Sequence, residues 1–505
     1  MQNSQANSAI SPDAPHNRQL LEAVSPRGYT NPVAAGRYNL VVVGGGTAGL
    51  VAAAGASSLG AKVALIERRH LGGDCLNFGC VPSKALLYEA RMLMMRQGTG
   101  KTISESDFQI LMERVRSARS GLAHHDSVER FAGLGVDVFL GEAHFRGPRI
   151  VAVAGQSLRF SNCVIATGTR PTCPAVPGLE RTEFLTNESI FELTTMPRRI
   201  CILGGGPIGC ELGQAFGRLG IEVTLLEAGS RLLPRDDEEA SAIVLKALCA
   251  EGVQVRTDSH AQGVEMSGGH WHIRIDADDA TQAIECDQLL VCAGRTPNVA
   301  GLNLEAAGVE YDETRGVHVD ATLRTSNSRI YAAGDVASPF RFTHAADAGA
   351  RIVIQNALFG FAGRRKSTSL VIPWCTYTDP EVAHVGITPS DAHQNGVALD
   401  TIRIGMDSVD RAVIEGETEG FLKVHLARGT DRMLGATIVC KNAGEMIGEI
   451  TLAISKGMGL KAIASVIHPY PTRSDAIRKA ADAYNRTRLT PPLRRVLERF
   501  FAWRR

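Results

Sequence analysis

The chain has 505 residues, more than one hydrophobic core usually serves, so roughly two to four domains are expected. A formal net charge of +1 excludes an overall field that would attract nucleic acid, and no apolar run is long enough to predict a membrane-spanning helix. Most of the 11 cysteines are scattered without metal-ligand spacing, so neither a secreted disulfide scaffold nor a resident metal site is expected. These properties are typical of a cytoplasmic protein.

Residues 1–36 form a segment rich in Asn, Ser, Ala, Gln and Pro. The segment has no continuous apolar stretch of the kind that a signal peptide requires. Such polar composition buries too little apolar surface to fold alone. We therefore predict a flexible N-terminal arm.

Two later segments repeat each other, YNLVVVGGGTAGLVAAAGASSLGAKVALIE at 38–67 and RRICILGGGPIGCELGQAFGRLGIEVTLLE at 198–227. Each has a β-rich run, the motif G-x-G-x-x-G, a stretch of small and apolar residues, Leu-Gly, a second β-rich run and a closing glutamate. The same interval separates the first motif glycine from that glutamate in both copies. The pattern predicts two βαβ units that bind dinucleotides, because the motif appears twice in its full structural context.

Each motif glycine has its own physical role. The first allows the tight turn out of the strand, the second leaves no Cβ between backbone and pyrophosphate, and the third lets helix and strand pack closely. A helix N-terminus then offers N–H groups to the phosphates. The closing glutamates, Glu67 and Glu227, are expected to accept hydrogen bonds from a ribose diol. In chain order the glycines are Gly44, Gly46 and Gly49 in the first unit and Gly204, Gly206 and Gly209 in the second.

A close cysteine pair follows the first unit in GGDCLNFGC, residues 72–80. Five residues of straight α-helix rise about 7.5 Å, whereas a disulfide needs Cα atoms within about 7 Å. Cys75 and Cys80 can therefore bond only if the backbone between them is irregular, and Asn77 and Gly79 permit that. A helix start beside the thiols, and Lys84 if it reaches inward, would favour thiolate. The pattern favours a bond that opens and closes over two reduced structural cysteines.

Three further segments have a β-rich run that ends in a glycine turn: VIATGTRP at 164–171, LLVCAGRTPN at 289–298 and IYAAGDVA at 330–337. Such turns recur where a nucleotide lies across strand ends. In the last of them Asp335 follows Gly334, which suits a carboxylate that binds a hydroxyl. Two dinucleotide sites together predict electron transfer between two cofactors.

With these motifs in this order, ending in HPYPT, residues 38–487 resemble the class I pyridine nucleotide–disulfide oxidoreductases, which include glutathione reductase, dihydrolipoamide dehydrogenase and mercuric reductase. The resemblance implies an α/β fold with two Rossmann-like domains, one inserted in the other, and a C-terminal α+β dimerisation domain. It also implies FAD at the first βαβ unit, NADH or NADPH at the second, and a homodimer whose active sites use both chains. The expected boundaries are 1–36 for the arm, 37–185 and 319–368 for the FAD domain, 186–318 for the nucleotide domain, 369–487 for the interface domain and 488–505 for a basic tail.

The resemblance also assigns roles to residues. Cys80 is expected to contact the flavin and Cys75 to exchange with the acceptor, while Lys84 and Glu211 match an ion pair near the flavin; a solvated surface Glu211 is the alternative. The FAD site is expected to comprise Gly44, Gly46, Gly49, Glu67, Gly73, Lys84, Ala143, Thr167, Gly168, Gly334 and Asp335. The nicotinamide nucleotide site is expected to comprise Gly204, Gly206, Gly209, Glu227 and Gly294.

The nucleotide is expected to be NADH, with NADPH as the alternative. A carboxylate at Glu227 accepts hydrogen bonds from a free 2′-hydroxyl and repels a 2′-phosphate. Arg231 is the first arginine after it, beyond Ala-Gly-Ser.

The family pattern breaks near the C-terminus, in HPYPTRSD at 468–475. Tyr470 stands where disulfide reductases carry a histidine base, and Asp475 stands where they carry the orienting glutamate. A phenol with a pKa of about 10 is a poor base for a thiol near neutral pH, which disfavours dihydrolipoamide as a substrate. His468 could replace the base, or it could have a surface or capping role.

A tyrosine at this position resembles mercuric reductase, but those enzymes carry a C-terminal cysteine pair and an N-terminal metal-binding module. Here no cysteine follows Cys440, and Cys375 is either a third thiol or a buried strand cysteine. We predict a small thiol-reactive acceptor. The alternatives are a dihydrolipoamide dehydrogenase and a non-catalytic flavin-binding redox sensor, and the intact Cys75, Cys80, Lys84 and Glu211 count against the sensor.

The tail LRRVLERFFAWRR predicts an amphipathic helix. Its apolar residues recur at helical spacing and are Leu493, Val496, Leu497, Phe500 and Phe501. Its basic residues are Arg494, Arg495, Arg499, Arg504 and Arg505. Packing against the enzyme itself and weak docking on an anionic membrane surface are the two interpretations.

Overall fold

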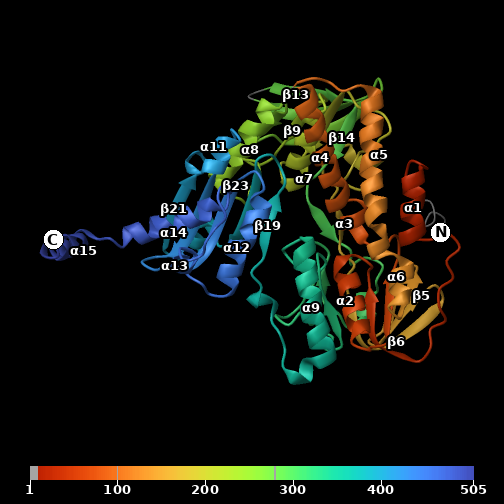
Figure 1. Ribbon diagram of the computed structural model, residues 1–505. Helices are drawn as coiled ribbons and strands as arrows, with labels where there is room; N and C mark the ends of the chain where they lie inside the picture. Colours follow the sequence, from red (N-terminus) through yellow and green to blue (C-terminus); the bar gives the residue numbers. More distant parts are fainter. Residues whose placement is uncertain (1–9, 99, 278–279) are drawn as a thin grey trace. The chain divides into compact units, whose positions relative to one another are not determined.

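The computed structural model describes residues 10–98, 100–277 and 280–505 (Figure 1). The chain divides into two units. The first consists of Met1–Ala228 and Glu251–Leu370, and the second of Gly229–Ala250 and Val371–Arg505.

The first unit contains a seven-stranded sheet in the order β3-β2-β1-β6-β5-β4, with β18 paired to β6 beside this path. The strands from β3 to β6 pair in parallel, and β18 joins β6 in parallel through the register Ile330↔Cys163. The chain therefore returns to this sheet through β18, after it has passed through the second sheet of this unit. The strands are β1 (Arg37–Val43), β2 (Val63–Glu67), β3 (Val136–Leu140), β4 (Ala143–Gly147), β5 (Ile150–Val153), β6 (Gln156–Ile165) and β18 (Ile330–Ala332).

Both faces of this sheet are covered, which explains why β1 is an almost continuous apolar run. On one face α2 (Thr47–Ser58) and α9 (Thr343–Phe359) lie side by side (Figure 1). Their buried residues share a core with β1 and β2. A second core on the other face includes Phe139, Phe145 and Phe160. The edge strand β3 is tied to β1 where the Tyr38 hydroxyl donates to Asp137 Oδ2 at 2.8 Å.

The second sheet of this unit is parallel and has the order β10-β9-β8-β14. A three-stranded antiparallel sheet packs beside it and shares its apolar core, which includes Trp271 and Ile273. Short pairs β7–β15 and β16–β17 complete the unit. The strands are β8 (Arg199–Leu203), β9 (Glu222–Leu226), β10 (Gln254–Arg256), β14 (Gln288–Val291), β11 (Ala261–Ser267), β12 (His270–Ala277), β13 (Ala280–Cys286), β7 (Thr169–Pro171), β15 (Arg295–Pro297), β16 (Tyr311–Asp312) and β17 (Gly316–Val317).

The helices that carry the predicted cysteine pair and its surroundings also belong to this unit. They are α3 (Gly73–Asn77), α4 (Cys80–Gln97), α5 (Glu105–Leu122), α6 (Val128–Gly133) and α7 (Pro207–Arg218). Helix α4 packs against both α5 and α7. It therefore joins the region of the first glycine loop to that of the second.

The predicted flexible arm is wrong for part of its length. Residues 1–9 lie outside the described residues, but helix α1 (Pro15–Val24) forms within the segment and packs against α5. Leu20 and Val24 are fully buried in the core of the first sheet. The composition of the whole arm hid this short apolar face, because Leu20, Leu21 and Val24 are few among many polar residues.

The second unit has a five-stranded antiparallel sheet in the order β19-β20-β23-β22-β21. Helices α12 and α14 pack their apolar faces against one face of this sheet (Figure 1). The strands are β19 (Pro373–Thr376), β20 (Glu381–Gly386), β21 (Leu399–Gly405), β22 (Phe421–Ala427) and β23 (Met433–Cys440). The helices are α8 (Glu238–Ala250), α10 (Pro389–Gln394), α11 (Asp410–Ile414), α12 (Ala443–Ser455), α13 (Leu460–Ile463), α14 (Asp475–Thr487) and α15 (Pro491–Trp503).

The predicted fold class is confirmed, with two Rossmann-like sheets, the first mixed because β5 joins β6 and β4 joins β5 in antiparallel pairs and the second parallel, and a C-terminal α+β part. The domain boundaries stay predictions. None of the described helices is both long and apolar enough to cross a membrane.

Candidate active site

The first glycine loop has the geometry that its sequence predicts. Gly44 has a φ of +110°, and a Cβ there would lie 2.3 Å from the Ala166 carbonyl oxygen. A Cβ on Gly49 would lie 1.8 Å from the Gly44 oxygen, so the third glycine lets α2 pack on β1. Helix α2 begins after Gly46 without a side-chain cap, which leaves its first N–H groups for phosphate oxygens.

Gly73 belongs to the same loop. A Cβ on Gly73 would lie 2.6 Å from the Gly46 Cα, and the Gly72 N–H donates to the Gly45 oxygen at 2.9 Å. The two glycine backbones are therefore in contact, and this contact seats the cysteine segment against the nucleotide loop.

Glu67 ends β2 beside this loop. Its carboxylate accepts from the Gly45 N–H at 2.6 Å and from the Arg69 N–H at 2.7 Å. Burial raises its pKa against these two hydrogen bonds. The Gly141 N–H donates to the Glu67 carbonyl oxygen just after β3 ends. Ala143, the first residue of β4, therefore follows at the same end of the sheet as Glu67.

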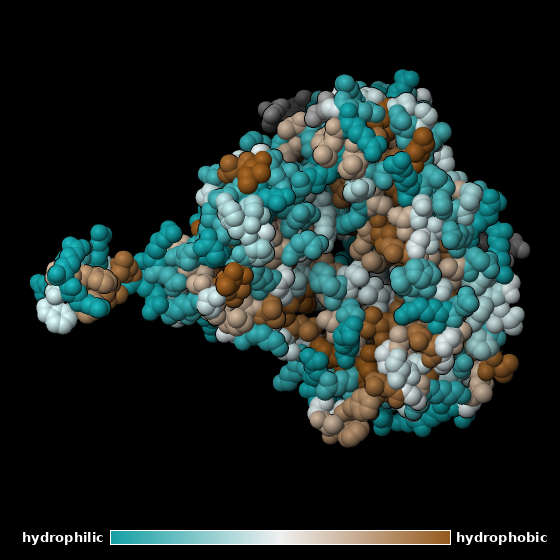
Figure 2. All heavy atoms as spheres, viewed as in Figure 1, coloured by the Kyte–Doolittle hydropathy of each residue, from teal (hydrophilic) through white to brown (hydrophobic). Residues whose placement is uncertain are grey.

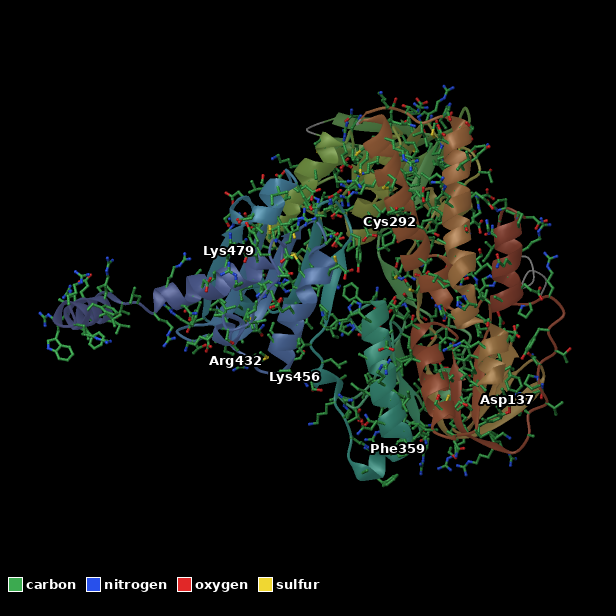
Figure 3. The ribbon with its side chains drawn as sticks, viewed as in Figure 1. Asp137, Cys292, Phe359, Arg432, Lys456 and Lys479 are labelled. Atoms are coloured by element: carbon green, nitrogen blue, oxygen red, sulfur yellow. The ribbon has the colours of Figure 1, made fainter. Side chains whose placement is uncertain are left out.

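The second glycine loop repeats the arrangement. A Cβ on Gly204 would lie 2.6 Å from the oxygen of Cys292, the residue after β14 that Figure 3 labels. A Cβ on Gly209 would lie 1.9 Å from the Gly204 oxygen, whereas one on Gly206 would meet no atom within 4 Å. The Glu227 carboxylate accepts from the Gly205 N–H at 2.6 Å. A tight turn, an uncapped helix start and an open position at the middle glycine fit a dinucleotide pyrophosphate.

The other glycine turns meet one another at the carboxyl ends of the strands. The Thr167 hydroxyl donates to the Asn298 carbonyl oxygen at 2.8 Å, and the Asn298 side chain returns a bond to the Thr167 oxygen. The Thr169 hydroxyl donates to Asp335 Oδ2 at 3.1 Å and accepts from Arg295 Nε at 2.7 Å. Burial raises the pKa of Asp335.

Three glycines line these turns. Gly168 and Gly294 have positive φ, and a Cβ on either would meet no atom closer than 3.9 Å. Gly334 lies against Ala48 of α2. The two glycine loops, with their uncapped helix starts, therefore fit the pyrophosphates of two dinucleotides, and the assignment of the individual cofactor residues stays a prediction.

The cysteine pair spans a break between two helices, as predicted. Helix α3 ends at Asn77, Gly79 takes a non-helical backbone with φ −126° and ψ −112°, and α4 begins at Cys80. Both cysteines are thiols, and the Cys75 sulfur is hydrogen-bonded to Cys80. The position of Cys80 as the first residue of an 18-residue helix also favours its thiolate.

The two thiols are electrostatically unlike. Cys75 donates the hydrogen bond, and this bond together with burial raises the pKa of its thiol. The same bond lowers the pKa of Cys80 to about 6 against the effect of burial, with further help from the Thr343 hydroxyl and the charge of Lys84. Thr343 Oγ1 lies 3.3 Å from the Cys80 sulfur. It was not among the predicted residues, because it is 263 positions away and no local motif marks it.

Lys84 and Glu211 form the predicted ion pair, with Nζ 2.6 Å from Oε2. Glu211 is only 4% exposed, so a solvated surface glutamate is excluded. The packing of α4 on α7 brings the two together.

Asp74 anchors the cysteine segment on one side. Its carboxylate accepts from Asn187 Nδ2 at 3.0 Å and pairs with Arg295 at 3.2 Å. Asn187 also donates to the Phe78 carbonyl oxygen at 3.1 Å. Asp74 and Asn187 were missed, since only their meeting in space reveals their role.

In the HPYPT segment of the second unit, Tyr470 and Asp475 are each bonded to another partner. The Tyr470 hydroxyl is exposed and donates to Asp410 Oδ2 at 2.8 Å, and this bond raises the pKa of the phenol. Asp475 does not hold the phenol in this chain. It is buried and pairs with Arg478 at 2.8 Å and with Lys479, labelled in Figure 3, at 3.4 Å.

His468 does not present an accessible ring nitrogen. Nε2 lies 2.9 Å from Glu449 Oε1, Nδ1 lies 3.2 Å from the Val466 carbonyl oxygen, and the side chain is 5% exposed. These contacts favour the structural role for His468 over that of a base.

Cys375 is half-buried on β19 and packs against the core of the second unit, as a strand cysteine would. Its sulfur lies 3.9 Å from Glu381 Oε2. Within residues 10–98, 100–277 and 280–505, no three His, Cys, Asp or Glu side chains form a group that could hold a metal ion.

The C-terminal helix α15 forms over Pro491–Trp503, and none of its residues is buried. Figure 2 shows apolar and hydrophilic residues side by side on its surface. The predicted amphipathic helix is confirmed, whereas packing of its apolar face against the enzyme is not what the structure has.

Comparison with known proteins agrees with this geometry. Residues 38–350 match the family model described as pyridine nucleotide-disulphide oxidoreductase, and residues 372–481 match its dimerisation domain. The chain is 36% identical over 456 residues to a mercuric reductase of Staphylococcus aureus, covering 89% of this chain and 83% of that one. It is 34% identical to a dihydrolipoyl dehydrogenase of Thermus scotoductus, covering 89% of this chain and 98% of the relative.

Solved structures give the same result. The HOCl-induced flavoprotein disulfide reductase RclA from Escherichia coli matches with a TM-score of 0.79 and 28% identity, covering 88% of this chain and 99% of that chain. Its Cu(II) complex matches with a TM-score of 0.78 and 27% identity over 87% and 98% of the two chains. The chain therefore belongs to the pyridine nucleotide-disulphide oxidoreductases, a family of flavoprotein enzymes that use FAD and a pyridine nucleotide.

Proposed function

We propose that this protein takes two electrons from NADH and passes them through the Cys75–Cys80 disulfide to a small thiol-reactive acceptor, with a thiol-bound soft metal ion such as Hg(II) as the first candidate. Bound FAD would accept hydride from the nicotinamide and return the electron pair to the disulfide. The observation that carries the proposal is the position of the cysteine pair, with Cys80 at the start of α4, its sulfur 3.3 Å from Thr343 Oγ1, and Lys84 of the same helix in an ion pair with Glu211.

The surroundings of the two sulfurs favour a different role for each thiol. Cys80, at a helix start and near Lys84, is suited to remain a thiolate beside the flavin. Cys75 keeps its proton in the bond to Cys80 and is suited to exchange with the acceptor. We assign Lys84 and Glu211 to the flavin side of this pair and Asp74 to the orientation of the segment.

The acceptor assignment rests on Tyr470. Reduction of a disulfide such as lipoamide requires a group that gives a proton to the departing thiolate and that acts as the base in the reverse reaction. A phenol that donates to Asp410 and has a raised pKa is unsuited to the role of that base. A thiol-bound Hg(II) ion requires no such base, since the protein sulfurs exchange for its thiolate ligands and the ion leaves as Hg(0) after it takes two electrons. The relatives named mercuric reductase and the Cu(II) complex of RclA support this class of acceptor.

The assay for this proposal compares NADH oxidation by the holoenzyme with Hg(II) bis-thiolate, lipoamide, glutathione disulfide and a quinone. We expect at least about tenfold faster turnover with Hg(II) than with lipoamide, as the loss of general acid–base catalysis predicts. Cys75→Ser should abolish the Hg(II) rate, with Cys173→Ser, an exposed cysteine outside the pair, as the matched control. Faster turnover with lipoamide would instead assign a dihydrolipoamide dehydrogenase, and no turnover with any acceptor would assign a redox sensor.

The preference for NADH rests on Glu227 and Arg231. Glu227 is placed by its bond to Gly205 at the loop where a ribose would lie. Arg231 donates to the carbonyl oxygens of Asp236 and Pro234, both at 2.8 Å, which occupies the guanidinium that could otherwise serve a 2′-phosphate. A homodimer is proposed from the matched dimerisation domain, with Tyr470 of each chain facing the cysteine pair of its partner.

We also propose that α15 makes weak contact with an anionic membrane surface. The helix has no buried residue, its apolar residues share one face, and arginines flank that face. Basic amphipathic helices with aromatic residues bind at such surfaces.

A further inference from the structure

Helix α1 lies outside the part of the chain that matches the family model, which begins at residue 38. It is nevertheless packed into the core of the first sheet, where Leu20 and Val24 share a buried cluster with Leu76 and Phe78 of the cysteine segment. The Leu71 N–H donates to the Val24 carbonyl oxygen at 3.1 Å. The helix therefore contacts the segment that leads into the redox pair.

A buried arginine connects α1 to that segment. Arg119 of α5 is fully buried. Its Nη2 donates to Asn17 Oδ1 at 2.9 Å, and its Nη1 donates to the Asn77 carbonyl oxygen at 2.9 Å. Burial lowers the pKa of Arg119 to about 10, so the side chain stays charged near neutral pH and both bonds are charge-assisted.

The orientation of Asn17 is fixed by a further bond. Its Nδ2 donates to the Pro12 carbonyl oxygen at 2.9 Å, so its oxygen must face Arg119. The side chain is 1% exposed. The amide is therefore shielded from solvent, and its hydrogen bond to Arg119 links it to the redox segment.

Asn77 lies between the two cysteines, and its hydrogen bonds connect Arg119 to the backbone around them. Its Nδ2 donates to the Leu71 oxygen at 3.0 Å and to the Gly73 oxygen at 2.8 Å, which closes the first turn of α3 around Cys75. Its carbonyl oxygen, at the helix break before Cys80, is the one that Arg119 holds. The contacts therefore run without interruption from Asn17 to the backbone of the redox segment.

We propose that α1 is a positioning element of the redox centre, in which Asn17, through Arg119, holds the Asn77 peptide and thereby stabilises the Cys75–Cys80 disulfide relative to the dithiol. The bent backbone at Phe78 and Gly79 turns the chain between the two cysteines, and holding this bend lowers the entropic cost of closing the bond. This inference rests on the proposed redox function of the pair.

The equilibrium of the pair with dithiothreitol measures this effect directly. Reduction breaks the Cys75–Cys80 bond and forms the ring disulfide of the reagent, as two electrons and two protons pass from reagent to protein. We expect Asn17→Leu in the holoenzyme to shift this equilibrium about tenfold toward the dithiol, equivalent to about 30 mV. Asn17→Asp keeps an oxygen for Arg119 and should restore the wild-type equilibrium.

Arg18→Ala is the matched control, since Arg18 lies on the same helix and forms an ion pair with the exposed Asp13. It should leave the equilibrium unchanged. A thermal melt of each variant detects a general loss of stability. Such a loss would lower Tm but would not change the thiol–disulfide equilibrium. If the leucine of Asn17→Leu disturbs the packing around α1, the smaller change Asn17→Ala is expected to give the same shift of the thiol–disulfide equilibrium.

An equilibrium within twofold of wild type in both Asn17→Leu and Asn17→Ala would overturn the inference. A wild-type protein in which Cys75 and Cys80 form no disulfide at all would instead overturn the proposed function. The two failures are therefore distinguishable in one experiment.

Discussion

Lys84 and Glu211 are 127 positions apart in the chain and form an ion pair in which Nζ lies 2.6 Å from Oε2. The pair is unequal in its access to water, because the Glu211 side chain is 5% exposed and that of Lys84 is 36% exposed. The cation also contributes to the lowered pKa of Cys80. The contact thus couples the helix after the second glycine loop to the cysteine pair.

This asymmetry predicts unequal costs for the two single substitutions. Lys84→Met removes a cation that lies 2.6 Å from a buried carboxylate and should lower the free energy of unfolding by about 1–3 kcal/mol. Glu211→Gln leaves a lysine that can turn to water, so we expect a loss of less than about 1 kcal/mol. Urea denaturation of both variants measures the difference, and equal losses would contradict this account.

The pKa of Cys80 predicts the pH dependence of its alkylation. Because that pKa is lowered to about 6, the thiolate is present above this pH and is lost as the pH falls through it. Iodoacetamide should therefore modify Cys80 in the reduced protein with a midpoint near pH 6, below the value of about 8.5 for an ordinary thiol.

Cys75→Ala removes the largest cause of the shift and should raise the midpoint, and Lys84→Met should raise it by less. Peptide mapping distinguishes Cys80 from the other cysteines. A midpoint that stays near pH 8.5 in the unsubstituted protein would exclude the hydrogen bond from Cys75 as its cause.

Tyr470→His tests whether the missing base limits the choice of acceptor. The imidazole would take the position of the phenol, within reach of Asp410, which could orient it. We expect lipoamide-dependent turnover to rise at least about tenfold, as general acid–base catalysis by the imidazole permits, without a matching gain with Hg(II). Tyr470→Phe is the control and should not increase the lipoamide rate.

Glu227 is expected to decide the choice of nucleotide. Glu227→Ala removes the carboxylate that would repel a 2′-phosphate, so kcat/KM should fall for NADH and rise for NADPH, with their ratio changing at least about tenfold. Glu67→Ala, the corresponding change in the first unit, should reduce FAD retention without altering this ratio. A higher kcat/KM for NADPH than for NADH in the unsubstituted enzyme would refute the assignment.

The C-terminal helix predicts binding to vesicles. Co-sedimentation with vesicles that contain phosphatidylserine should occur at low salt and decrease at high salt, because screening weakens the attraction of the arginines. Phe500→Asp and Arg495→Gln should each weaken it, through the apolar and the basic face respectively. Protein that stays in the supernatant at low salt would remove this proposal, and concentration-dependent self-association through the helix would replace it.

Much of the active site could be predicted because its parts are local. The glycines of each loop lie within a few residues of one another, and steric limits at Gly44 and Gly204 constrain the backbone whatever surrounds it. The break between Cys75 and Cys80 is likewise local, since helix geometry requires it if the pair is to bond and Asn77 and Gly79 permit it. The error over residues 1–36 came from composition averaged over a long segment, which concealed the apolar face of α1.

The sequence by itself determined the two dinucleotide loops, the redox pair and the missing histidine, since each depends on residue types at short, fixed spacing. Only the tertiary structure decided what holds them. Thr343 beside Cys80, Asn17 on Arg119 and Glu449 against His468 are contacts between distant segments. Such contacts arise from the packing of helices and strands on one another, and short spacing along a chain carries no record of that packing.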